Sequence, residues 1–87
     1  KYDEALINLD LANELEPNNL GILKSYALSF FHTGRYEEAQ KSHEKILQIE
    51  PNAFESYLAQ GNIAFYQGEM DKVLSKFFYM RFLLLIR

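Results

Sequence analysis

Apolar residues recur along this chain at intervals of three and four, the spacing that places them on one face of an α-helix. Within residues 22–31, Leu23, Tyr26, Ala27 and Phe30 form such a stripe. Gly34 then interrupts the pattern. A second helical stripe consists of Tyr36, Ala39, Ile46 and Ile49. Pro51 ends this second helix, since proline disfavours helical geometry in the residue before it. The pattern predicts a unit of helix, tight turn, helix and short loop.

The unit recurs with a period of 34 residues. Pro17 and Pro51 lie 34 positions apart, and each follows a glutamate and precedes an asparagine. When residues 1–19 are aligned with residues 35–53, six positions are identical, whereas ordinary residue frequencies give about one. Gly34 aligns with Gly68 at the same period. The repeat therefore predicts a second tight turn at Gly68 and five helices in the whole chain.

The recurring residues resemble the signature of the tetratricopeptide repeat family. The family's small residue at the helix crossing corresponds to Ala27 and Gly61, and its turn glycine corresponds to Gly34 and Gly68. Further matches are the aromatic residues Tyr2 and Tyr36, the second-helix alanines Ala5 and Ala39, and the terminal prolines Pro17 and Pro51. The sequence departs from the family pattern at His43, Ile46, Met80 and Leu85.

This resemblance implies an all-α fold in which antiparallel helix-turn-helix repeats stack as an α-solenoid. Residues 1–87 then form a single domain. Residues 1–19 are the second helix of one repeat, residues 20–53 are a full repeat, and residues 54–87 are a full repeat with an atypical C-terminal helix. Each hairpin of such an array is stabilised by stacking on its neighbours. A close helix crossing at Gly61 predicts that Gly61→Leu costs roughly 1–3 kcal/mol through overpacking.

Composition and spacing exclude several classes of chemistry. The 12 acidic and 9 basic residues give a net charge of -3, which disfavours general binding to nucleic acid. The chain has no cysteine, and no apolar run reaches the roughly 18 residues of a membrane-spanning helix. Ser42, His43 and Glu44 are neighbours on a predicted helix, where adjacent side chains point about 100° apart and form no catalytic constellation. We therefore predict no enzyme activity, no catalytic, cofactor-binding or metal-binding residues, and no cofactor. A cytoplasmic location is the expectation.

The first helix of each repeat carries a second stripe, rotated from the core stripe by roughly 100°. In the resembled family this face lines a concave groove that binds peptides or helices of partner proteins. The groove residues predicted on this basis are Lys24, Leu28, Phe31, Leu58, Asn62 and Phe65. Their largely apolar character predicts a protein or peptide partner with an apolar or aromatic segment, bound with little contribution from Lys24. The alternative is that Leu28, Leu58 and Phe65 pack as ordinary core between adjacent helices.

These features predict a protein-interaction module, an adaptor or scaffold that binds a peptide or helix of a partner in the concave groove. Two alternatives remain open at the level of sequence. One is a structural segment of a larger multiprotein assembly. The other is an accessory repeat region of an enzyme whose catalytic domain lies outside residues 1–87.

The last predicted helix is apolar on nearly every side between residues 73 and 86. Such a helix is normally buried, so it predicts either further repeats or self-association through residues 74–86, with Phe78 and Leu84 at the contact. Membrane insertion is the weaker explanation, because the stretch is short and contains Lys76 and Arg81. No membrane partner is therefore predicted.

Overall fold

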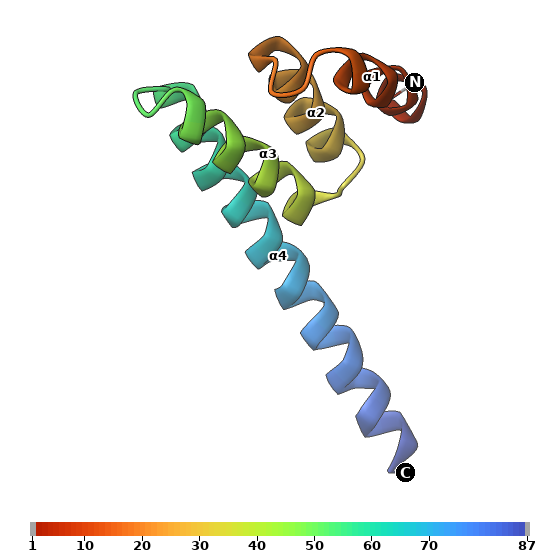
Figure 1. The fold of residues 1–87 in the computed structure, drawn as a ribbon. Helices are drawn as coiled ribbons and strands as arrows, with labels where there is room; N and C mark the ends of the chain where they lie inside the picture. The colour runs from red at the N-terminus through yellow and green to blue at the C-terminus, as the bar shows by residue number, and fades with distance from the viewer. Residues whose placement is uncertain (1, 87) are drawn as a thin grey trace.

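The computed structural model describes residues 2–86, and at Val73 and Met80 it describes the backbone alone. Its four α-helices are α1 (Tyr2–Leu15), α2 (Leu20–His32), α3 (Tyr36–Ile49) and α4 (Phe54–Leu85). No strand occurs among these residues, so the predicted all-α fold class is confirmed. Consecutive helices pack on one another: α1 on α2, α2 on α3 and α3 on α4 (Figure 1).

Helix α4 runs without interruption through Gly68, so the predicted turn at that residue and the predicted fifth helix are wrong. The helix is 32 residues long, whereas the other three have 13 or 14 residues. Its first half packs on α3, and its second half extends away from the other helices (Figure 1). Within residues 2–86, no helix combines the length and the apolar character needed to cross a membrane.

The turn between α2 and α3 shows how a helix ends at this point of the repeat. Gly34 has φ 76°, in the left-handed region that glycine adopts without steric cost. Its amide donates to the Phe31 carbonyl at 3.1 Å. The Arg35 amide donates to the Phe30 carbonyl at 2.8 Å, which completes the Schellman arrangement. The Arg35 guanidinium also lies 4.8 Å from the centre of the Phe30 ring and pairs with Glu38 at 2.6 Å.

The side chains that support this turn are missing 34 residues later. Ala64 occupies the position of Phe30, so no aromatic ring is present to hold a cation. Glu69 and Lys72 occupy the positions of Arg35 and Glu38 and form an ion pair at 3.5 Å along the helix, where such a pair supports helical geometry. A glycine inside a helix costs only about 1 kcal/mol relative to alanine. The helix therefore propagates through Gly68.

Helix α2 packs on both α1 and α3. The buried apolar residues of these three helices are Leu6, Leu23, Ala27, Ala39 and Ile46. Ala27 is 2% exposed and Ala39 is 0% exposed, and their small side chains allow α2 and α3 to approach closely. The Tyr26 hydroxyl donates a hydrogen bond to Asp10, which joins α2 to α1. Burial, followed by this hydrogen bond, raises the pKa of Tyr26 to about 12.

The close crossing predicted at Gly61 is not formed. A Cβ atom placed at Gly61 meets no other atom within 4 Å, because the segment that would cross it continues straight as part of α4. The overpacking cost expected for Gly61→Leu therefore does not apply to this conformation. The corresponding crossing does exist one repeat earlier, at Ala27.

Candidate functional site

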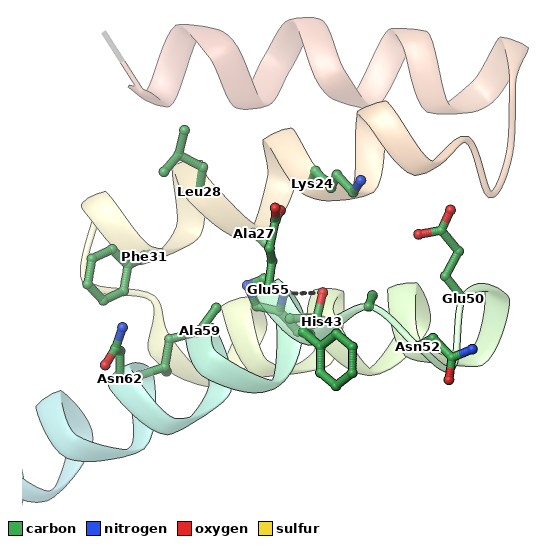
Figure 2. Close-up of a pocket in the computed structure, with 14 residues that line it drawn as sticks. Lys24, Ala27, Leu28, Phe31, His43, Glu50, Asn52, Glu55, Ala59 and Asn62 are labelled. Atoms are coloured by element: carbon green, nitrogen blue, oxygen red, sulfur yellow. Dashed lines mark hydrogen bonds between the residues drawn. The ribbon is translucent and has the colours of Figure 1, made fainter.

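An open groove lies between α2 and the first half of α4 (Figure 2). Its volume is about 660 Å³. Side chains of α2 and α4 form the walls, His43 of α3 lies between them, and the loop of residues 50–53 borders one end. The groove therefore depends on the packing of α2 and α4 on the same helix, α3.

The two ends of the groove differ in polarity. At one end, Phe31 of α2 lies near Asn62 of α4, and Leu28 belongs to the same wall as Phe31 (Figure 2). At the other end lies Glu50, and Glu55 projects from α4 between the two ends (Figure 2). Leu28 is 54% exposed, so its apolar side chain is accessible from solvent. An extended segment lying in the groove would therefore meet apolar side chains first and carboxylates further along.

The charged groups of the groove are available to a ligand. Among residues 2–86, the ion pairs are Arg35–Glu38, Lys41–Glu37 and Lys72–Glu69, and none of them involves Glu50, Glu55 or Lys24. Two carboxylates and one ammonium group give the groove a net negative charge when His43 is neutral. A cationic side chain of a ligand would gain a partner in Glu50 or Glu55 without displacing an existing ion pair.

An aromatic cluster fixes the apolar end. The Phe31 ring lies 5.7 Å from the Tyr36 ring and 5.4 Å from the Tyr66 ring, measured between ring centres. Tyr36 and Tyr66 are themselves stacked at 6.2 Å. These three rings come from α2, α3 and α4, and such contacts contribute roughly 0.5–1.5 kcal/mol each beyond area burial. The cluster holds Phe31 in place and sets the separation of the groove walls.

His43 joins α3 to α4 beneath the groove. Its Nδ1 atom and the Ser56 hydroxyl are 3.1 Å apart and share a hydrogen bond, and Ser56 is buried. A second link between the same helices is the Gln40 side-chain amide, which donates to the Gln60 carbonyl at 3.0 Å. Burial lowers the pKa of His43 below its ordinary value of 6.5, because the charged imidazolium is poorly solvated there.

Acidification is expected to destabilise the fold through His43. The unfolded chain binds a proton at His43 near pH 6.5, whereas the folded chain binds it only at lower pH. The free energy of unfolding should therefore fall as the pH drops from 7 through the range just below 6.5. Urea unfolding of the unmodified chain and of His43→Leu across this range measures the effect. The His43→Leu chain should lose most of the dependence.

Ser56→Ala provides the matched control for this measurement. It removes the hydrogen-bond partner but leaves His43 buried, so the pH dependence should persist. If His43→Leu keeps the full dependence, protonation of another group is responsible.

The structure brings four of the six predicted groove residues together: Lys24, Leu28, Phe31 and Asn62. Leu58 and Phe65 lie outside the groove and are 71% and 64% exposed. Each directly precedes a residue that faces the groove or its aromatic cluster, Ala59 or Tyr66, and adjacent helical residues point about 100° apart. Because Leu58 and Phe65 are exposed, the alternative that they pack as core does not apply to them.

Several groove residues were not predicted from the sequence. His43 and Ser56 come from the packing of α3 on α4, and Glu50 comes from the loop after α3. The period of 34 residues locates the loop but carries no information on the direction of its side chains. Glu55 does belong to the rotated stripe of α4, at a helical spacing from Asn62.

The predicted self-association residues lie far from the groove. Phe78 and Leu84 are on the second half of α4 and are 63% and 68% exposed. Among the described residues, no group of three His, Cys, Asp or Glu side chains could hold a metal ion.

Comparison of the chain with protein-family models, curated proteins and solved structures gives no match. What the groove can bind therefore follows from its own side chains.

Proposed function

We propose that this chain is a tetratricopeptide-like interaction module, in which stacked helix pairs bind a short segment of a partner protein between α2 and α4. The observation that supports this proposal most directly is the groove of about 660 Å³, with Lys24, Leu28, Phe31 and Asn62 along its walls. A groove of this size is in the range that encloses ligands in proteins. Its walls carry accessible apolar side chains and carboxylates without ion-pair partners among the described residues.

The polarity of the groove defines the ligand chemistry. Leu28 and Phe31 favour a large aliphatic or aromatic side chain, whose burial contributes roughly 1.5–3 kcal/mol. The Asn62 amide, beside them, has a donor and an acceptor for the ligand backbone. Glu50 and Glu55 favour a lysine or arginine further along the segment. The proposed ligand is therefore a short peptide segment with an apolar anchor at one end and a basic residue at the other.

Selection from a library of short random peptides tests this proposal. The immobilised 87-residue chain should enrich peptides that combine an aromatic or large aliphatic residue with a lysine or arginine. The enriched peptides are then measured against two charge-reversal variants, Glu55→Lys in the groove and Glu44→Lys on the exposed surface of α3. Glu55→Lys should weaken binding at least about tenfold, since a charge-assisted contact becomes a repulsion. Glu44→Lys should leave binding unchanged.

Two results would contradict the proposal. One is the absence of any enriched peptide. The other is an equal loss of affinity in Glu55→Lys and Glu44→Lys, which would indicate attraction to the overall negative charge of the chain rather than recognition in the groove.

A further inference from the structure

One face of α4 is largely exposed, although the same face of α2 is buried. On α2, which packs on α3, Leu23 is 5% exposed and Ala27 is 2% exposed. The residues 34 positions later on α4 are Tyr57 and Gly61. Tyr57 is 53% exposed, and Gly61 has open space above it. In the repeat pattern, the segment after Gly68 would cover this face, but here it forms the outer half of α4, residues 69–85, which we call the arm.

The free face of α4 has a mirrored pattern about Gly68. Positions 4, 7, 11 and 14 residues to either side of Gly68 return to the same side of a helix with 3.6 residues per turn, within roughly 40°. The pairs at these positions are Ala64 and Lys72, Gly61 and Ser75, Tyr57 and Tyr79, and Phe54 and Phe82. Small residues therefore lie near the centre of the face, apart from Lys72, and aromatic residues lie at both of its ends.

We propose that this face binds a second copy of the chain, with the two α4 helices antiparallel and a two-fold axis at Gly68. In this arrangement a residue on one side of Gly68 lies opposite its mirror position in the other copy. The arm of each copy then covers the free face of the other, in the place that the second helix of its own repeat would occupy. This inference goes beyond the peptide-binding groove and does not depend on it, although the face and the groove share Phe54.

The mirrored pattern suits such a contact. Gly61 and Ser75 allow the helix backbones to approach closely, and the stem of Lys72 can lie along Ala64 with its ammonium group in water. The four aromatic residues are between 53% and 77% exposed and are available for burial. If each loses roughly 100–150 Å², two copies bury on the order of 1,000 Å² through these side chains alone, close to the total of about 1,200–2,000 Å² found in stable interfaces.

A second copy fits the face better than the arm of the same chain. Folding the arm back requires a tight turn at Gly68, and the ring of Phe30 and the guanidinium of Arg35 that support the turn at Gly34 have no counterparts there. Two straight α4 helices from separate copies cover each other's free face without any turn. A two-fold contact of this kind uses the same face of both copies, so no further copy can add to it and the assembly stops at the dimer.

Sedimentation velocity of the 87-residue chain at micromolar concentrations tests the proposal. The unmodified chain should form a dimer. Tyr79→Glu, on the mirrored face, should raise the dissociation constant at least about tenfold. Leu84→Glu is the matched control, because Leu84 is 16 residues from Gly68 and points roughly 160° away from the face. Although the apolar pattern of the sequence placed Leu84 at the contact, the helix geometry predicts that Leu84→Glu leaves the dimer intact.

Gly61→Leu tests the other half of the face. The new side chain meets open space in the single copy, so it should not impair folding, yet it should weaken the dimer by a similar factor. A monomeric unmodified chain would overturn the proposal. So would a dimer that Gly61→Leu and Tyr79→Glu leave unchanged, or one that Leu84→Glu dissociates as strongly as Tyr79→Glu.

Cross-linking tests the antiparallel orientation directly. The chain has no cysteine, so single cysteines can be introduced without background. A mixture of Tyr57→Cys and Tyr79→Cys chains should yield a mixed disulfide-linked dimer on mild oxidation, and neither chain alone should cross-link efficiently. Efficient linkage of Tyr57→Cys to itself would indicate a parallel contact and overturn the proposed arrangement.

Discussion

Replacement of Ile46 by alanine is expected to lower the free energy of unfolding by about 2–5 kcal/mol. Ile46 is 0% exposed and is one of the two largest side chains that are fully buried. Its truncation leaves a cavity in α3, the helix on which both α2 and α4 pack. A domain of this size has a total stability of only roughly 4–13 kcal/mol, so the loss removes a large fraction of it. Urea unfolding followed by circular dichroism measures the change.

Ile49→Ala is the control for this substitution. Ile49 lies on the same helix, three residues later, but is 44% exposed. The same change of side chain should therefore cost less than about 1 kcal/mol there. Equal losses in the two variants would show that α3 does not pack through the face that contains Ile46.

The hydrophobic period accounts for the first three helices. The glycine and prolines that interrupt the pattern coincide with real helix ends: α2 ends at His32, before Gly34, and α3 ends at Ile49, before Pro51. These signals are local, because a positive φ favours glycine and a proline restrains the residue before it. Local signals of this kind can be recognised without knowledge of the tertiary contacts.

At Gly68, the 34-residue period alone was insufficient to predict whether the helix ends. Gly68 is the same residue as Gly34 at the same position of the repeat, yet α4 continues through it. The difference lies in the surrounding side chains, since the stack of Arg35 on Phe30 has no equivalent around Gly68. Glycine permits a left-handed turn but does not impose one. The prediction of a turn required these side chains as well as the glycine.

The predicted stripe and the groove overlap only in part, because the rotation of a helix about its axis depends on tertiary contacts. Leu28 and Phe31, from the rotated stripe on α2, both line the groove, and the period defines their helix well. On α4, Leu58 and Phe65 lie outside the groove, whereas the adjacent Ala59 lines it and the adjacent Tyr66 belongs to the aromatic cluster. The rotation of α4 is set by its contact with α3, through His43 and Ser56, and the sequence pattern alone does not determine it.

The largest effect expected on ligand binding is that of Leu28→Ser. Leu28 lies in the groove and is exposed, so the substitution removes an apolar contact to the ligand without leaving a cavity in the core. Loss of a leucine contact of roughly 1.5–3 kcal/mol corresponds to about a 10–100-fold weaker affinity. Leu58→Ser is the matched control, because it is the same change at an exposed leucine of α4 outside the groove.

The most direct test of the proposed groove is the dissociation constant of the most strongly enriched library peptide, measured by calorimetry for the unmodified chain and these two leucine variants. Circular dichroism first establishes that all three chains have the same helix content. We expect at least about tenfold weaker binding to Leu28→Ser and unchanged binding to Leu58→Ser. Unchanged binding to Leu28→Ser, or a larger loss in Leu58→Ser, would contradict the assignment of the groove between α2 and α4 as the binding site.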